Sequence, residues 1–301
     1  MKKALVISAI ALLTAATGVV TRGYTAPSPA VQETITGDWT AKVRRTDKGP
    51  VLWLSLHRNT DARKGDFQMS HDFQLRDFTG LDPNANSNVQ FTLQREAGAV
   101  LFDGLFKDGK GVGDFKFTPN GGFIATMRNL GYDGLTGEKL FTMAVLDVSS
   151  NFINELKSLG YKPDLDQLIG LRALGVTGVF AREAQGWGFG KLSVEDLIEV
   201  KAMGINQDYI RSMKSLGFDN LSLKKVVELK ALGVSENYVK EMRSAGFKNI
   251  PVNKLIEMKA MGITADYVKK MRDLGLKDVS IDELIQIKAT GADKILAREK
   301  R

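Results

Sequence analysis

A repeat of about 29 residues in the C-terminal part of the chain constrains the fold more than any other feature. Six aromatic residues mark one position of successive units, at steps of 28 or 29 residues: Phe123, Phe152, Phe180, Tyr209, Tyr238 and Tyr267. Self-similarity at a fixed period is typical of repeat architectures, in which each unit contacts only its neighbours along the chain.

Each unit contains two short segments whose apolar residues are spaced for a helix. In residues 206–217, the side chains of Tyr209, Met213 and Leu216 recur on one helical face. Helices of about ten residues do not persist alone in water, so the hairpins must stack. A leucine-rich repeat can have a similar length, but no unit shows its Leu-x-Leu strand followed by Asn. The pattern therefore predicts an array of helical hairpins.

Polar side chains and glycines mark the expected helix boundaries. Ser222 is a typical N-cap, and Ser193 and Ser280 each precede an acidic residue by three positions, as in a capping box. Glycines followed by apolar residues, as in Gly217-Phe218, are typical of helix C-termini. Two carboxylate pairs, Asp164/Asp166 and Glu195/Asp196, lie beside helix starts, where the helix dipole favours them over a catalytic role.

Two rows of cations recur at fixed positions of the units. The first, which we term the cation row, consists of Arg172, Lys201, Lys230, Lys259 and Lys288. The second row, interrupted by Gln185, consists of Arg128, Lys157, Lys214, Arg243 and Arg272. Each cation stands three residues before a glycine, where it complements the dipole of its helix. Stacking would also align the cation row into a surface that could bind an acidic partner, although Glu199, Glu228 and Glu257 partly neutralise it.

Aromatic residues within the repeat are expected to serve packing. The repeated tyrosines fall on the apolar stripe, which favours core positions over an exposed aromatic strip. Trp187 stands in an irregular Gln185-Gly-Trp-Gly-Phe189 segment and indicates a local distortion of one unit.

Residues 35–118 alternate between apolar and polar side chains with a period of two, as strands do. Asp108-Gly109 and Gly111-Val-Gly113 are typical of turns, so we expect an antiparallel meander around an aromatic core. The spacing of Gly104, Gly109, Gly111 and Gly113 leaves a β-solenoid as an alternative. The Gly-rich segment around Lys110 lacks the strand–loop–helix context of a phosphate-binding loop.

The N-terminus has the layout of a secretory signal. Lys2 and Lys3 precede an uncharged apolar run over 4–20, and Ser28-Pro29-Ala30 places small residues before a possible cleavage after Ala30. We expect a periplasmic or secreted protein with no membrane span after cleavage, and an uncleaved anchor is the alternative.

Composition limits the chemistry that the chain can perform. The absence of cysteine excludes disulfides and thiolate metal sites. Residues 31–118 are neutral and residues 119–301 carry a charge of +4, which does not indicate a nucleic-acid binder. His57 and His71 are the only histidines; with Asp72 or Asp77 they could form a metal or hydrolase site, which we expect less than an ordinary strand position.

The unit motif Gly-Val/Ile-x-x-x-Tyr-Val/Ile-x-x-Met-Lys/Arg-x-x-Gly-Phe, joined to Leu-Ser-x-x-x-Leu/Val-Ile/Val-x-x-Lys-Ala-x-Gly, resembles a known family. It is similar to helical repeats in exported segments of β-lactam-sensor-type (BlaR-like) membrane metallopeptidases and in free-standing exported proteins. The resemblance covers roughly 119–292, and the segment Gly98–Phe106 resembles the region before those repeats. This chain has no His-Glu-x-x-His motif, so the resemblance implies part of a sensing or envelope system rather than a protease.

Together these observations predict an α+β multidomain chain. We expect a signal peptide in 1–30, a small antiparallel β-rich domain in 31–118, six helical hairpins in 119–292 and a charged cap in 293–301. The predicted function is a non-catalytic binding or scaffold role in the cell envelope, without cofactors and with an envelope protein or acidic molecule as partner. The alternatives are a small-ligand sensor that uses the β domain and, less favoured, a hydrolase.

Overall fold

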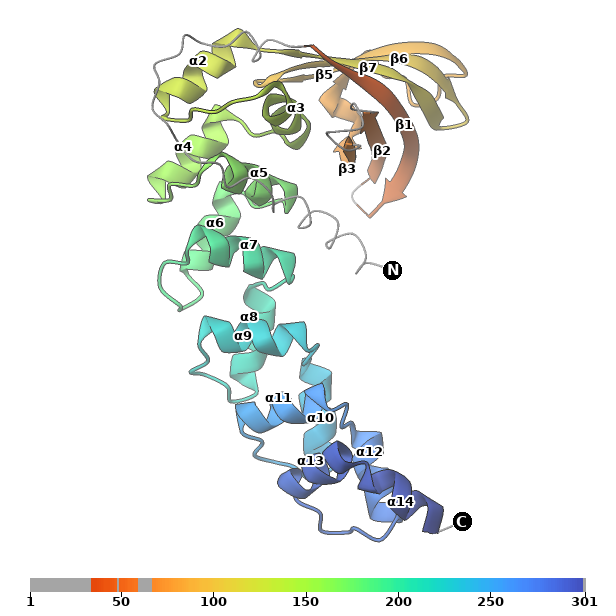
Figure 1. Cartoon of the computed structure of the whole chain (residues 1–301), viewed down its shortest axis with the longest axis vertical. Helices are drawn as coiled ribbons and strands as arrows, with labels where there is room; N and C mark the ends of the chain where they lie inside the picture. The colour runs from red at the N-terminus through yellow and green to blue at the C-terminus, as the bar shows by residue number, and fades with distance from the viewer. Residues whose placement is uncertain (1–33, 48, 59–66, 300–301) are drawn as a thin grey trace, which may run out of the picture. The chain divides into compact units, whose positions relative to one another are not determined.

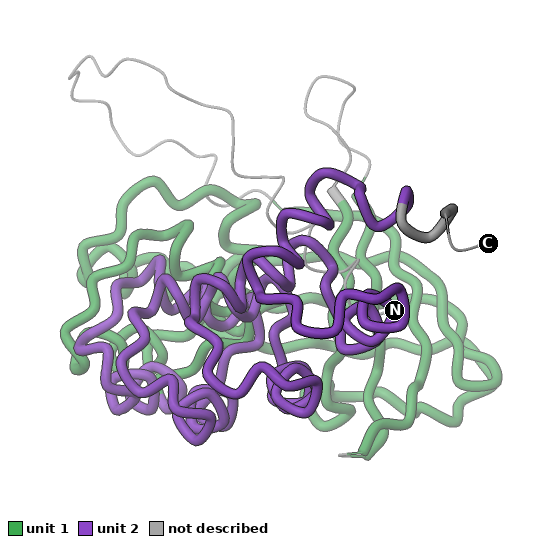
Figure 2. Tube along the Cα trace, turned by 90° about the horizontal axis from the view of Figure 1, so that it is seen from below, with its two compact units in different colours: residues 1–178 green, residues 179–301 purple. Residues whose placement is uncertain are grey.

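A computed structural model of the chain describes residues 34–47, 49–58 and 67–299 (Figure 1). The predicted signal peptide therefore lies outside the described residues. The chain divides into two compact units, Met1–Gly178 and Val179–Arg301, drawn in green and purple in Figure 2.

The first unit contains an antiparallel sheet of seven strands, in the spatial order β3-β2-β1-β7-β6-β5-β4. The strands are β1 (Ile35–Thr46), β2 (Gly49–Arg58), β3 (Phe67–Gln74), β4 (Phe78–Thr79), β5 (Ser87–Arg95), β6 (Gly98–Lys107) and β7 (Lys110–Pro119). Only the short 3-10 helix η2 (Leu75–Asp77) separates β3 from β4, which are the two edge strands. The sheet must therefore curl until its edges approach each other. The antiparallel β domain is confirmed, and the β-solenoid alternative is wrong.

Aromatic side chains fill the concave face of the curled sheet. Trp39 is fully buried, and its indole Nε1 donates hydrogen bonds to the carbonyl oxygens of Asp103 (3.1 Å) and Asp114 (3.0 Å). Its ring meets the edge of Phe91 at 5.3 Å between ring centroids, and Phe91 stacks on Phe102 at 4.7 Å. These contacts tie β1 to β5, β6 and β7 and satisfy the only polar atom of the indole.

Two glycines of β7 stand where no side chain fits: Gly111 makes room for this tryptophan, and Gly113 for the backbone of β6. A Cβ atom on Gly111 would lie 2.6 Å from the Trp39 ring, and one on Gly113 would collide with the carbonyl oxygen of Asp103. The interpretation of Gly111-Val-Gly113 as a turn is therefore wrong, because both glycines lie within the strand. The turn itself is Asp108-Gly109, where both residues have positive φ (51° and 70°), as two-residue hairpin turns require.

Helix α3 (Gly137–Leu146) covers the concave face. It lies against β1, β5, β6 and β7, and the ring of Phe141 stacks on Phe115 with 5.2 Å between centroids (Figure 1). The first unit also contains α2 (Gly121–Asn129), α4 (Ser150–Ser158) and α5 (Leu165–Ala173). The division between the compact units thus falls at Gly178, within the repeats, rather than at the end of the sheet.

The second unit consists of short helices that follow one another as hairpins. They are α6 (Gly178–Gln185), α7 (Val194–Ala202), α8 (Gln207–Ser215), α9 (Leu223–Ala231), α10 (Glu236–Ser244), α11 (Val252–Ala260), α12 (Ala265–Asp273), α13 (Ile281–Thr290) and α14 (Ala292–Glu299). A β domain followed by a helical array is the predicted architecture, and it is confirmed. Helix α14 occupies most of the segment that was expected to form a charged cap.

The predicted capping chemistry is present in the structure. The Ser222 hydroxyl accepts a hydrogen bond from the backbone N–H of Lys225, and Ser193 and Ser280 each form a capping box with the acidic residue three positions later. Gly217 has φ of 86°, and the N–H of Phe218 donates to the carbonyl of Met213 at 3.1 Å. The helices are thus delimited by local hydrogen bonds, as the sequence pattern predicts.

Candidate interaction surface of the helical repeats

The cation row lies over aromatic rings. Each cation of the row stands above the ring of the repeated aromatic residue 20 or 21 positions earlier. The pairs, with the distance from the cation to the ring centroid, are Arg172–Phe152 (5.2 Å), Lys201–Phe180 (4.4 Å), Lys230–Tyr209 (4.5 Å), Lys259–Tyr238 (4.3 Å) and Lys288–Tyr267 (4.3 Å). All five cations are half-buried.

These contacts give the cation row a role within the fold. A cation over an aromatic ring contributes about 0.5–2 kcal/mol, depending on how far the pair is removed from water. Each pair joins the second helix of a hairpin to the first, so the repeated cation and the repeated ring form one packing element. Use of the same five side chains as a partner-binding row stays a prediction.

The tyrosines of the repeat bond to the connections between hairpins. Tyr238 is 4% exposed, and its hydroxyl donates a hydrogen bond of 2.8 Å to the carbonyl of Ile263, which lies between α11 and α12. Tyr209 donates to Val234 in the same way at 3.0 Å. Burial raises the pKa of both Tyr209 and Tyr238 to about 12. The tyrosines thus belong to the packed core of the repeats, as predicted, rather than to an exposed strip.

The second row of cations also connects one hairpin to the preceding one. Lys157 Nζ donates to the carbonyl of Leu130 at 2.8 Å, and Arg243 donates to the carbonyl of Leu216. Leu130 and Leu216 are C-cap residues of the first helices of the preceding hairpins. These cations therefore satisfy carbonyls that a helix end leaves free. The sequence suggested a contact with the dipole of the cation's own helix, whereas the structure places the charge at the end of a neighbour.

Arg172 differs from the rest of the cation row in its surroundings. Its guanidinium donates to the carbonyl of Leu146 (3.1 Å) and pairs with the Asp147 carboxylate (3.3 Å). Asp147 also pairs with Arg95 on β5 at 3.5 Å, and it adopts a left-handed conformation with φ of 57° at the end of α3. This network attaches α5 to the sheet within the first unit. No local sequence pattern predicted it.

An open groove lies between the first helices of two successive hairpins. It measures about 600 Å³ and runs between α10 and α12. Its lining includes Lys240, Glu241, Ser244, Asp266, Lys269 and Asp273. Lys240 pairs with Glu236 at 2.6 Å and Lys269 with Asp273 at 2.7 Å, so charges of both signs border the groove. Such a lining suits a polar peptide segment, because it offers donors and acceptors along its length.

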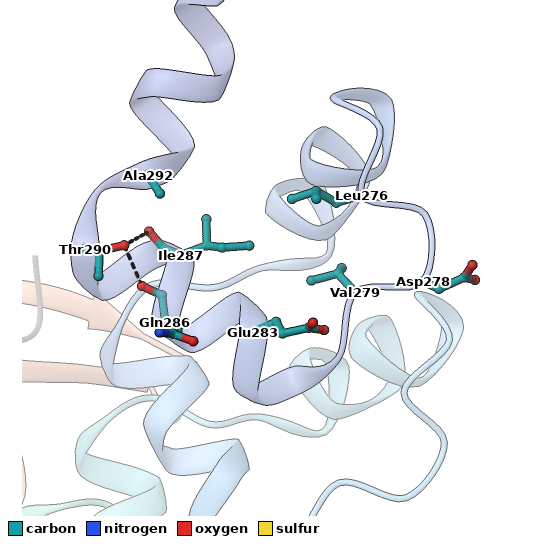
Figure 3. A pocket seen from close by; sticks show the side chains of 8 residues that line it. All are labelled: Leu276, Asp278, Val279, Glu283, Gln286, Ile287, Thr290 and Ala292. Carbon is teal, nitrogen blue, oxygen red and sulfur yellow. Dashed lines mark hydrogen bonds between the residues drawn. The ribbon is translucent and has the colours of Figure 1, made fainter.

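A second hollow, of about 500 Å³, lies at α13 between α14 and the loop after α12. The side chains of Leu276, Val279 and Ile287 point toward one another across it (Figure 3). Ile287 stands 29 residues after Met258, which is fully buried in the preceding hairpin, whereas Ile287 is half-buried. The hollow is therefore the last layer of the repeat core, left partly open to solvent.

The two histidines do not come together. His71 pairs directly with Leu54 and shares the concave face, whereas His57 pairs with Asp38 and lies on the opposite face of the sheet. Desolvation lowers the pKa of His71 and outweighs the opposing charge of Asp72. Within the residues that the structure describes, no three side chains of His, Asp or Glu are grouped as ligands for a metal ion. A shared site of both histidines with Asp72 or Asp77 is thus not formed.

One carboxylate of each pair takes part in capping the start of a helix, where the sequence predicted carboxylates favoured by the helix dipole. Asp164 is the N-cap of α5 and accepts from the N–H of Gln167 at 2.8 Å. Asp196 accepts from the N–H of Ser193 at 2.9 Å at the start of α7. Trp187 is buried and packs edge-on against Phe180 at 5.6 Å beyond the shortened helix α6, which accounts for the irregular sequence there.

Comparison with known proteins found no match to this chain. No family model matches the chain, and no curated protein matches it. Over residues 34–47, 49–58 and 67–299, no helix combines the length and apolar character needed to cross a bilayer.

Proposed function

We propose that the chain is an exported, non-catalytic binding protein of the cell envelope whose helical repeats hold a protein partner. The observation that carries this proposal is the groove between α10 and α12, in whose lining the side chains of Lys240, Glu241, Asp266, Lys269 and Asp273 are exposed. Repeats of this kind present extended surfaces on which neighbouring units offer equivalent contacts. The apolar N-terminal run and the resemblance to BlaR-like exported segments support the envelope as the location.

The cation row is less suited than the groove to a first test. Reversal of its charges would remove the contacts with the aromatic rings, so a lost interaction could reflect a damaged array. Ser244 is exposed in the lining of the groove, so an arginine at this position can extend into solvent. It therefore offers a position where binding can be changed without loss of the fold.

Site-specific photocrosslinking in intact cell envelopes tests the proposal. A photoreactive amino acid is placed at Ser244 or, as the control, at Lys224, which is exposed on α9 outside the groove. We expect one discrete crosslinked protein from position 244 and none from position 224. Added wild-type protein should compete for the product, and the Ser244→Arg variant should not. Equal products from both positions, or none from either, would contradict a partner in the groove.

The alternative of a small ligand inside the β domain has weaker support. Trp39, Phe91 and Phe102 fill the concave face of the sheet, and Phe141 of α3 closes it against Phe115. A ligand there would have to displace packed aromatic rings, which is costly in a close-packed interior.

A further inference from the structure

The convex face of the sheet carries an ordered pattern of charges that the proposed function does not use. Because side chains alternate along a strand, one face of β1, β7 and β6 meets α3 and the aromatic core, and the other faces outward. The outward residues at the centre of these strands are exposed. Two of them, Val112 and Leu105, are large apolar residues that are 54% and 47% exposed.

Three rows cross the strands in exact register on this face. The acidic row consists of Asp38, Asp114 and Asp103, each directly opposite the next on β1, β7 and β6. The basic row consists of Lys42, Lys110 and Lys107, paired in the same way. Between them runs a middle row of Thr40, Val112 and Leu105. The face thus changes from negative to apolar to positive along the strands.

This arrangement is unfavourable in a single copy of the chain. Like charges directly opposite each other on neighbouring strands repel, and each row places three of them side by side. Among the described residues, none of the six charged side chains forms an ion pair, and the Asp103 carboxylate accepts only a hydrogen bond of 3.3 Å from Gln90. The charges are therefore available to a partner that carries the complementary pattern.

We propose that this face pairs with the same face of a second copy of the chain. A two-fold axis along the middle row turns one sheet over onto the other. It places the acidic row of each copy against the basic row of its partner, and Val112 and Leu105 against their own equivalents. Such an isologous contact needs a self-complementary surface, and a negative–apolar–positive sequence of rows is self-complementary about its middle. Two sheets packed face to face in this way are a standard arrangement.

The expected association is weak. Three strands spaced by about 4.8 Å and three rows spaced by about 7 Å give a contact on the order of 300 Å² per copy. This area is smaller than in stable dimers, so we expect a transient dimer that forms only at high protein concentration. Because exposed ion pairs are screened, the dimer should weaken as the salt concentration rises. This inference does not depend on a partner in the helical groove.

Disulfide formation between single cysteines tests the axis directly, because the chain has no cysteine of its own. In the proposed dimer, Val112 meets Val112 of the second copy, so Val112→Cys should crosslink under mild oxidation. Lys116→Cys is the matched control, since Lys116 is exposed on the same strand and face. Its Cα lies about 14 Å along the strand from the axis, far beyond the reach of a disulfide to its own equivalent. We expect crosslinking at position 112 to be at least tenfold faster.

Charge reversal tests the complementarity in the Val112→Cys background. The double variant Asp103→Lys/Asp114→Lys and the double variant Lys107→Asp/Lys110→Asp should each stop crosslinking when alone, and an equimolar mixture should restore it. Circular dichroism confirms that each variant is folded, and sedimentation velocity of the wild-type chain gives the concentration dependence of the dimer. Equal rates at positions 112 and 116, crosslinking that is indifferent to charge reversal, or a chain that stays monomeric at the highest concentration would each overturn the proposal.

Discussion

At the residue scale, one aromatic position of the repeat serves two neighbours at once. The ring of Tyr238 lies under the Lys259 ammonium at 4.3 Å, and its hydroxyl reaches the carbonyl of Ile263 at 2.8 Å. At Phe152 and Phe180 the chain keeps the ring and the cation but has no hydroxyl. The repeat itself therefore shows that the two contacts can be separated.

The separation gives a pair of variants with different expected effects on stability. Tyr238→Phe removes one hydrogen bond and should lower the free energy of unfolding by about 1 kcal/mol. Lys259→Met keeps most of the apolar stem but removes the cation from the ring, and it should cost about 0.5–2 kcal/mol. Urea denaturation of both variants and of the double variant measures the effects. A double variant no less stable than Tyr238→Phe alone would show that the ammonium does not stabilise the ring.

The same hydroxyl predicts how stability depends on pH. Burial raises the pKa of Tyr238 to about 12 in the folded chain, while an unfolded tyrosine titrates near pH 10. Below about pH 10 both states hold the proton and stability is unaffected. As the pH rises from about 10 to 12, the unfolded state alone releases its proton, so folding is weakened by about 2 kcal/mol.

Denaturation curves at several pH values, for the wild type and Tyr238→Phe, isolate this effect. The variant should lose less stability between about pH 10 and 12, because it has no phenol to titrate at this position. Parallel losses in the two proteins would mean that the Tyr238 hydroxyl titrates normally.

The sequence alone predicts the contacts of some residues but not of others. Ser222 could be assigned as an N-cap because its partner, the N–H of Lys225, lies three residues away. The ring beneath Lys259 could not be assigned, because it lies 21 residues earlier and the pairing depends on how the two helices of a hairpin pack. For the same reason the sequence placed the cations correctly in the last helical turn but did not identify the rings and carbonyls that they contact.

At the element scale, the sheet shows that a residue far away in sequence can determine whether a glycine-rich segment forms a turn or a strand. Gly111 and Gly113 have the composition of a turn, yet they lie in β7. Trp39 of β1 occupies the space where a Gly111 side chain would be, and the backbone of β6 occupies that space at Gly113. Trp39 lies far earlier in the chain, so the sequence around the two glycines gives no sign of it. The alternation of the other strand residues is a local signal, so it predicted the sheet correctly.

Substitution of the glycines tests this account. An added methyl group at Gly113 would collide with the backbone of β6, so Gly113→Ala should destabilise the first unit by about 3 kcal/mol or more. Gly121→Ala is the control: it lies at the start of α2, nothing stands within 4 Å of its added Cβ, and the helix should gain about 0.5–1 kcal/mol. Thermal unfolding followed by circular dichroism distinguishes them. Similar melting temperatures for the two variants would show that β7 can move to accommodate the methyl group.

At the scale of the whole molecule, the chain consists of two compact units that meet within a continuous sequence of helical hairpins. In the first unit, long-range strand pairing and the aromatic core hold residues far apart in sequence together. In the second, each hairpin contacts its neighbours in sequence, so stability should be a sum of local terms. We therefore expect the two units to lose their structure separately.

A reciprocal pair of core substitutions tests this independence. Leu229 in α9 and Leu93 in β5 are both fully buried, and replacement of either by alanine should cost about 2–5 kcal/mol in its own unit. Hydrogen exchange read out by peptide should then report faster exchange over α8–α13 for Leu229→Ala, with the strands unchanged. Leu93→Ala should accelerate exchange in the strands and leave α8–α13 protected. If either variant accelerated exchange uniformly along the chain, the two units would form one cooperative structure, and stability could not be divided between a non-local sheet and a local helical array.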